Sequence, residues 1–395
     1  MPPSVISPAD QQHRRLAPTM GLGPGHDTHR PLNRAILGCR SLVRLPGRSP
    51  ALPKGFFCGS LELELGMKTI LERPLHRLIL VPQWILLAVV AFLVGVGSGF
   101  AGEKRPPAER LGYQATDILL IVNGDDAGMC HAANLATIEC LEKGQMRCST
   151  IMVPCPWFPE IAAYAKGHPE KDFGVHLCHT AEWRKYRWGP VASRDKVPGL
   201  VDPQGYLWHD VPDVYAHATP EEALIEGRAQ IQRALTSGVD VTHLDSHMGT
   251  LQLDPRYVQA YLQLAAEFDL PVRMASQQTM ARFGYPQLRD QFAARGIVFP
   301  DYFVYEELKD ESKDVKGFWL EIVKRLKPGV TELYIHAALP TEELKAITGS
   351  WPTRSKEFEV FTHDEEMKKL VVERRIILLG YRPLRDLQRK ERKEG

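Results

Sequence analysis

Between Asp117 and the C-terminus, short apolar runs alternate with segments of helical periodicity, and this alternation restricts the possible folds more than any other feature. The run at 118–122 is continuously apolar and rich in β-branched residues, as expected of a parallel strand covered on both faces. Strands that alternate with helices are typical of a parallel sheet, so we predict an α/β fold. An irregular (β/α) barrel of about seven mostly parallel strands fits the pattern and the length.

The individual elements are predicted from runs and capping signals. Strands are expected at 118–122, 149–153, 173–177, 241–244, 272–274, 297–299, 333–335 and 376–379, and helices at 131–142, 158–166, 256–268 and 315–326. Two further helices should begin at capping boxes, one opened by Thr219 and running to Ser237, the other opened by Thr362. The segment 178–217 has little regular pattern, and a loop of that length is usually functional. No linker-like stretch divides residues 104–395, so we expect one domain there.

The first hundred residues have a different character. Residues 1–66 are rich in Pro, Gly and Arg and show no sustained apolar period, which predicts a disordered extension. From Met67 a basic stretch, the apolar run 84–97 and the small-residue end 98–101 follow in the order of a secretory signal, and translation starting at Met67 is left open. We predict that 67–101 is a signal peptide, with an uncleaved membrane anchor as the alternative. The protein is therefore expected to be exported, to the periplasm or outside the cell.

Composition limits the partners. The formal net charge is +1, so the composition indicates neither a strongly basic surface for nucleic acid nor an acidic tail. We expect no nucleic-acid partner and a small or neutral substrate; membrane contact is expected only if 67–101 stays attached, and the oligomeric state is open. Five of the seven cysteines follow residue 104 without a CxxC pair, which predicts buried free thiols, with one disulfide left open.

Polar residues gather at the C-terminal ends of the expected strands, where parallel barrels build their active sites. Asp125 and Asp126 follow the first strand, His176 ends the third, and His336 ends a late one; His243, Asp245 and His247 sit at or after the strand at 241–244. Adjacent buried carboxylates repel each other unless a cation lies nearby. One aspartate with two histidines is a common ligand set for a catalytic divalent metal, although helix capping by the aspartates and core positions for the histidines remain alternatives.

Other residues are candidates for proton transfer and substrate binding. His336 can act as a general acid because imidazole titrates near neutral pH, and Arg273, a charge inside an apolar run, needs a carboxylate partner. The loop at 182–188 carries Trp183, Tyr186, Arg187 and Trp188, a mixture of rings and cations suited to sugars. Packing of these rings on the barrel, or stacking on single-stranded nucleic acid, are the alternatives, and the net charge and export signal weigh against the second.

The motifs Asn123-Gly-Asp-Asp-Ala-Gly128, Ser149-Thr-Ile-Met-Val153, Gly174-Val-His-Leu177 and Thr242-His-Leu-Asp-Ser-His247 occur in one order along the chain. In this order they resemble the YdjC-like carbohydrate deacetylases, which include chitooligosaccharide deacetylases, over residues 117–380. The resemblance implies a polysaccharide-deacetylase-like barrel, a metal ion on Asp126, His176 and His247, Asp125 as general base, and His336 as candidate acid.

The chain departs from the pattern of that family at three positions. Gly249 stands where a further histidine is usual, Ala127 where phenylalanine is usual, and Ala337 where proline often follows the late histidine. None of these changes removes a presumed metal ligand. They affect positions expected near the substrate, so the sugar need not be a chitin fragment.

Taken together, the residues and the resemblance predict a metal-dependent hydrolase in residues 104–395 that removes N-acetyl groups from amino sugars or oligosaccharides. One divalent ion, magnesium or zinc, would activate water, with Asp125 as base, His336 as acid and Arg273 beside Asp125. Two other functions remain possible: a non-catalytic carbohydrate-binding protein on the same fold, and a metal-dependent phosphoesterase.

Overall fold

The computed structural model describes residues 105–306 and 314–394. The predicted extension at 1–66 and the predicted signal or anchor segment at 67–101 lie outside the described residues, so both stay predictions, as do the domain boundaries. Within the described ranges, none of the helices combines the length and the apolar character that crossing a membrane requires.

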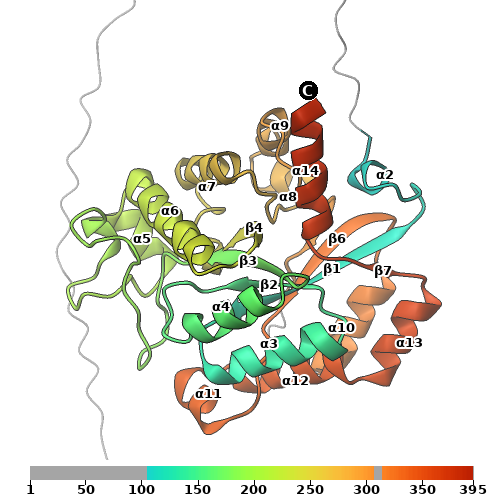
Figure 1. Ribbon diagram of the computed structural model, residues 1–395, viewed down its shortest axis with the longest axis horizontal. Helices are drawn as coiled ribbons and strands as arrows, with labels where there is room; N and C mark the ends of the chain where they lie inside the picture. Colours follow the sequence, from blue (N-terminus) through green and yellow to red (C-terminus); the bar gives the residue numbers. More distant parts are fainter. Residues whose placement is uncertain (1–104, 307–313, 395) are drawn as a thin grey trace, which may run out of the picture. The chain divides into compact units, whose positions relative to one another are not determined.

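A single curled sheet forms the centre of the described chain (Figure 1). Its strands are β1 (Ile118–Ala127), β2 (Cys148–Ile151), β3 (Asp172–Leu177), β4 (Val241–Ser246), β5 (Tyr302–Val304), β6 (Gly329–Ile335) and β7 (Ile377–Leu378). The order across the sheet is β4-β3-β2-β1-β6-β5, with β7 paired to β1, and every strand pair is parallel. The predicted α/β fold with seven mostly parallel strands is confirmed; the sheet forms a half-barrel.

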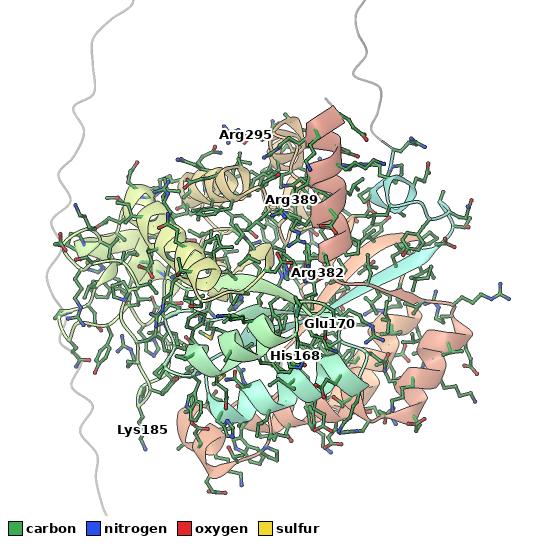
Figure 2. All side chains as sticks on the ribbon, viewed as in Figure 1. His168, Glu170, Lys185, Arg295, Arg382 and Arg389 are labelled. Atoms are coloured by element: carbon green, nitrogen blue, oxygen red, sulfur yellow. The ribbon has the colours of Figure 1, made fainter. Side chains whose placement is uncertain are left out.

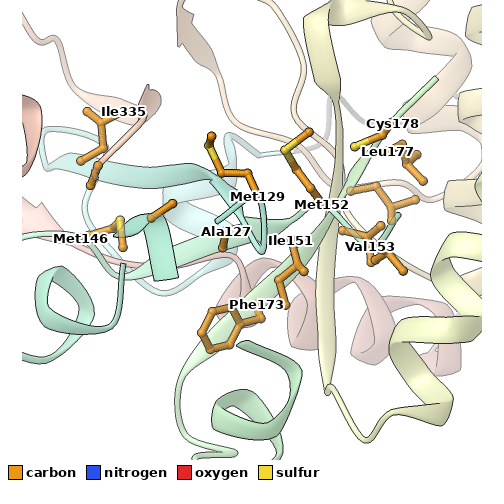
Figure 3. Close-up of a cluster of buried hydrophobic side chains, with 14 of the residues drawn as sticks. Ala127, Met129, Met146, Ile151, Met152, Val153, Phe173, Leu177, Cys178 and Ile335 are labelled. Carbon is orange, nitrogen blue, oxygen red and sulfur yellow. The ribbon is translucent and has the colours of Figure 1, made fainter. Parts of the chain in front are cut away.

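Helices connect the strands, some covering the outer face of the sheet and others closing one end of it. They are α2 (Pro107–Arg110), α3 (His131–Lys143), α4 (Phe158–Gly167), α5 (Val211–His217), α6 (Pro220–Thr236), α7 (Pro255–Phe268), α8 (Gln277–Arg282), α9 (Leu288–Ala294), α10 (Val315–Lys324), α11 (Glu342–Ile347), α12 (Trp351–Thr362), α13 (Glu365–Glu373) and α14 (Arg382–Glu394), with 3-10 turns η1 (Pro198–Leu200) and η2 (His247–Gly249). Figure 1 shows α3, α12, α10 and α13 side by side. Outward-facing side chains of the strands, among them Ile151, Phe173 and Leu177, form the apolar layer beneath the helices (Figure 3).

Three sequence expectations differ from the structure. The runs at 272–274 and 297–299 are not strands: Val272 makes one isolated bridge to Leu244 and one hydrogen bond to the carbonyl of Val298, too few successive bonds for a ladder. These segments nevertheless lie between β4 and β5, where the half-barrel is open. The short strand β5 was not expected from the sequence. The helix expected from Thr362 instead begins at Glu365, because the Asp364 side chain accepts the hydrogen bond of the Met367 amide.

The inner face of the sheet changes from apolar to polar along the strands. Alternate residues of a strand share a face, and the inner positions near the strand starts form an apolar cluster closed by α2 and α14 that includes Leu119, Ile121, Cys148, Val330, Tyr381 and Leu384. Two residues further along, the same face carries Asn123, Asp125, Thr150, His176, Asp245 and Glu332, all buried. The fold therefore concentrates its buried polar groups at the C-terminal ends of the strands.

The long segment 178–217 is held against this end by α6. Both carboxylate oxygens of Glu226 accept backbone N–H bonds from the loop, from Val191 at 2.9 Å and from Ala192 at 2.8 Å. One turn later, the Gln230 side chain bonds both the N–H and the carbonyl of Cys178. Because Glu226 is fully buried, these loop amides depend on it rather than on water.

Replacing Glu226 should therefore loosen the loop. In Glu226→Gln one loop amide faces an NH₂ group instead of an acceptor, which should lower the free energy of unfolding by about 1–3 kcal/mol. Urea denaturation measures this loss, and hydrogen exchange should show faster exchange at Val191 or Ala192. Glu221→Gln, an exposed change on the same helix, is the matched control. Equal stability of the two variants would contradict the anchoring role.

Candidate metal and catalytic site

A bulge in β1 brings two adjacent carboxylates to one cavity. Successive residues of a regular strand point to opposite faces, so Asp125 and Asp126 would ordinarily diverge. Here the pairing of β1 with β2 shifts register between Gly124 and Ala127, and Asp126 has a φ of 69°, in the left-handed region. Both side chains consequently line the same cavity. Because a non-glycine residue at such an angle is strained, the surrounding structure must hold it in place.

The cavity has a volume of about 580 Å³ and lies at the C-terminal ends of the strands. Its wall combines acidic, basic, imidazole and aromatic side chains, and its lining residues come from β1, β3, β4, β5, β6, α12 and the connecting segments. The residues with ionisable or aromatic side chains are Asp125, Asp126, His176, Glu182, Trp183, His247, Arg273, Phe303, Tyr305, Tyr334, His336 and Arg354.

Asp126, His176 and His247 present three ligand atoms to one point. Asp126 Oδ1 lies 3.4 Å from His176 Nε2 and 3.6 Å from His247 Nδ1, and the two ring nitrogens are 3.2 Å apart. A tetrahedral shell with metal–ligand bonds of about 2.1 Å places its ligand atoms about 3.4 Å apart. The three atoms therefore have the spacing of three corners of such a shell.

The outer nitrogen of each histidine is held by a carboxylate. His176 Nδ1 lies 2.7 Å from Asp245 Oδ1, and His247 Nε2 lies 2.9 Å from Glu182 Oε2. An N–H donated to each carboxylate leaves the opposite ring nitrogen with its lone pair directed at the shared point, as in metal sites. Burial disfavours a charged ring at His247, but Glu182 raises its pKa to about 9. A metal ion would thus displace a proton from Nδ1 when it binds.

The charges of the site also fit a cation. Asp126 Oδ1 is buried and has no hydrogen-bond partner among the described residues, although such an atom is costly to leave unpaired. The carboxylates Asp125, Asp126, Asp245 and Glu182 outnumber the guanidinium groups of Arg273 and Arg354. With neutral imidazoles the site has excess negative charge that a divalent ion would balance.

Arg273 fixes the other aspartate. Its Nη1 and Nη2 donate to the two oxygens of Asp125 at 2.8 and 2.7 Å, and its Nε donates to Glu332 at 2.8 Å. Burial alone would raise the pKa of Asp125, but Arg273 holds it below its usual value. Asp125 is therefore an ionised carboxylate with a fixed orientation, next to the three possible ligands.

Comparison with known proteins agrees with this geometry. The model of the family described as YdjC-like protein matches residues 119–371. The chain belongs to this family.

The alignments of this chain with named relatives cover nearly the whole length of those relatives. A carbohydrate deacetylase of Thermoanaerobacter pseudethanolicus is 30% identical over 262 residues, 66% of this chain and 97% of that protein. A carbohydrate deacetylase of Thermus thermophilus is 31% identical over 265 residues, 66% of this chain and 92% of that protein. Among solved structures, a protein of Enterococcus faecalis V583 with a suggested role in cellobiose-phosphate cleavage matches with a TM-score of 0.59 at 27% identity, covering 68% of this chain and 99% of that one.

Arg354 was not singled out from the sequence of this YdjC-like chain. It projects from α12, donates to Asp126 Oδ2 at 2.7 Å, and its guanidinium lies 5.7 Å from the centroid of a Trp183 ring. Burial would raise the pKa of Asp126, and Arg354 opposes this, so that the pKa lies well below the usual value. Nothing in the sequence around Arg354 distinguishes it from a surface arginine, because its partner is 228 residues away.

His336 follows β6 and lines the cavity. Its Nε2 lies 4.0 Å from Asp126 Oδ2 and its side chain is 32% exposed, so it is the most accessible histidine around the ligand set. The Glu357 side chain accepts its backbone N–H at 2.8 Å and fixes this point of the chain. Burial lowers the pKa of the ring.

The residues of the 182–188 loop have different positions. Trp183 lines the cavity, whereas Tyr186, Arg187 and Trp188 are not among its lining residues. Tyr186 donates to the carbonyl of Met129, and Arg187 pairs with Asp202 at 2.9 Å. The Trp188 ring packs against that of Trp183. The rings of Tyr186 and Trp188 pack against Trp183, and Arg187 is held by Asp202; contact with a substrate stays a prediction for all three. Lys185 of the same loop points away from the domain (Figure 2).

His243 is a core residue. Its ring stacks on that of Tyr381 with centroids 4.0 Å apart, and its nitrogens meet Thr242 Oγ1 and Asn123 Oδ1. Burial lowers its pKa well below the usual value. It supports Asn123, whose amide in turn donates to Asp125 at 2.9 Å.

The role of the Asp245 carboxylate in supporting His176 can be tested by measuring metal affinity. Asp245→Asn should weaken binding of zinc to the metal-stripped protein by about 10- to 100-fold, because a neutral amide replaces the charged carboxylate that orients the His176 ring and makes it more basic. Competition with a chromophoric chelator measures the affinity. Asp290→Asn, an exposed change on α9, is the control and should bind as the unmodified protein does. Unchanged affinity in Asp245→Asn would contradict the role of this carboxylate in supporting a metal ligand.

Proposed function

We propose that this protein is a metal-dependent carbohydrate deacetylase that hydrolyses the N-acetyl groups of amino sugars or oligosaccharides. The observation that carries the proposal is the buried Asp126 Oδ1, which has no hydrogen bond among the described residues and lies between two ring nitrogens. Each of these nitrogens belongs to a histidine whose other nitrogen is held by a carboxylate. The named relatives, both carbohydrate deacetylases that this chain covers almost completely, support the same reaction class.

Asp126, His176 and His247 would hold one divalent ion. Bound there, the ion supplies a Lewis acid that lowers the pKa of a coordinated water and polarises the acetyl carbonyl. Two imidazoles suit zinc, while the neighbouring carboxylates tolerate magnesium. The spacing of the three ligand atoms matches the tetrahedral geometry that zinc prefers.

The remaining residues act on the proton and on the sugar. Asp125, ionised and oriented by Arg273, takes the proton of the attacking water as general base. His336, half-buried in the cavity wall, gives a proton to the departing amine from its imidazolium form. Trp183 lines the cavity, and its ring is the aromatic surface from the 182–188 loop on which the apolar side of a sugar would pack.

Acetate release from the full-length protein tests this proposal. The substrates are a panel of N-acetylated and O-acetylated saccharides, offered to metal-stripped protein refilled with zinc or magnesium. Release should require the metal and should fall by about 100- to 10,000-fold in Asp125→Asn, which removes the base but none of the three ligands. The variant should still bind one equivalent of metal.

Other outcomes would favour other functions. Stoichiometric metal with no release from any saccharide, together with saccharide binding, would identify a carbohydrate-binding protein. Hydrolysis of a generic phosphodiester in place of the acetylated sugars would identify a phosphoesterase. Full activity in Asp125→Asn would assign the base to a different residue.

A further inference from the structure

A second cavity adjoins the candidate catalytic site. It has a volume of about 290 Å³ and shares four lining residues with the larger cavity: Gln252, Leu253, Phe303 and Tyr305. Arg273, which holds Asp125, has its guanidinium carbon 5.2 Å from the centroid of the Phe303 ring. The second cavity therefore begins about one side chain away from the proposed base. A group bound in the second cavity can therefore be part of the same substrate whose amide lies at Asp125.

The lining of this cavity is mostly apolar. Its buried part includes Met274, Met280 and Phe292, and its outer part includes Leu253 and Phe283, with exposed fractions of 62% and 61%. Large apolar side chains exposed together on one surface usually mark a binding site. Because the cavity and its apolar rim are continuous with a site that has a proposed reaction, the ligand is best sought in the substrate.

Among the described residues, four of the five polar side chains in the lining, all but Tyr285, already have hydrogen-bond partners within the protein; for Tyr305 the partner is Arg282. The Tyr261 hydroxyl donates to the carbonyl of Leu244 at 2.7 Å, and the Gln252 amide donates to the carbonyl of Arg273 at 3.0 Å. Thr279 Oγ1 bonds the Ser276 hydroxyl. A second sugar ring would leave water and find few partners here for its hydroxyls, which costs free energy for each group left unpaired. An alkyl or aryl group has no such cost and gains from leaving water.

We propose that this apolar cavity binds an alkyl or aryl group of about four to eight carbons carried by the substrate, close to the amide that is hydrolysed. The inference rests on the proposed deacetylase function and specifies its substrate class. Two sources have the required chemistry: an acyl chain longer than acetyl on the nitrogen, or an apolar aglycone on the sugar. The preferred substrate would then be an amphiphilic amide of an amino sugar and not a free chitin fragment.

Three synthetic probes distinguish the sources. They are the methyl glycoside of N-acetylglucosamine, its hexyl glycoside, and the methyl glycoside of N-hexanoylglucosamine. Calorimetry on zinc-loaded Asp125→Asn measures binding without relying on turnover, and hydrolysis by the unmodified protein is measured separately. One hexyl-bearing or hexanoyl-bearing probe should bind at least about tenfold more tightly than the methyl glycoside, because several methylene groups leave water.

Variants of the lining locate the effect. Ala275→Phe places a ring in the cavity and should abolish the preference for the longer probe, measured as the ratio of its affinity to that of the methyl glycoside. Phe283→Ser, an exposed change at the rim, should reduce the same ratio and keeps the test valid if Ala275→Phe folds poorly. Val372→Ala, which trims an apolar side chain with 74% exposure on α13, should leave the ratio unchanged.

The outcomes separate the two proposals. Equal binding of all three probes, or a preference that both lining variants retain, would overturn the apolar site even if acetate is released. A preference that the lining variants remove would support the site even if no probe is hydrolysed, and the failure would then belong to the deacetylase proposal alone. Tighter binding of the hexyl glycoside assigns the cavity to an aglycone, and tighter binding of the hexanoyl amide assigns it to the acyl chain.

Discussion

One buried guanidinium organises the interior of this barrel. Arg273 bonds Asp125 through two nitrogens and Glu332 through the third, and its Nη1 lies 3.1 Å from Asp245. The rings of Phe303 and Tyr334 lie near its guanidinium carbon, at 5.2 and 5.1 Å. Burial raises the pKa of Glu332 to about 7 even beside this cation, so carboxylates at this depth need a cation in bonding contact. The polar layer of the barrel therefore depends on Arg273.

The backbone position of Arg273 adds a second role. Its N–H bonds the carbonyl of Leu244 on β4, and its own carbonyl accepts from Gln252. The segment containing it lies where the sheet is open between β4 and β5. Arg273 thus partly closes this gap through its backbone and orients Asp125 through its side chain. The orientation of the proposed base therefore depends on the same segment that closes the barrel. Asp245 extends the connection, since one of its oxygens serves His176 and the other faces Arg273.

The sequence predicted the parts of this arrangement that depend on local pattern. Asp125, Asp126, His176, His247 and His336 all follow or end apolar runs, and parallel strands bring such positions together. Arg273 could be expected to need a carboxylate, because a charge inside an apolar run must be paired. Five residues from four separate segments could therefore be assigned to one cavity before any coordinates were considered.

The rest depends on contacts that no local pattern records. The bulge that turns Asp126 toward Asp125 arises from a register shift between β1 and β2. The sequence predicted that this strand ends at residue 122, before the bulge. Glu182 and Arg354 owe their roles to partners 65 and 228 residues away. Composition alone also could not distinguish Trp183, which reaches the cavity, from Trp188, which packs behind it.

Gly249 is one of the three positions that depart from the family pattern, and it affects the shape of the site. The resemblance implies a histidine at this position, yet here the residue has a φ of 68° and lines the catalytic cavity. A Cβ atom on it would lie 3.2 Å from Leu253 Cγ, closer than most such contacts. Leu253 belongs to the walls of both cavities, so a larger residue at 249 would be strained and would push against the boundary between them. The glycine therefore leaves room for Leu253 to pack over the turn and to form an apolar part of the wall of both cavities.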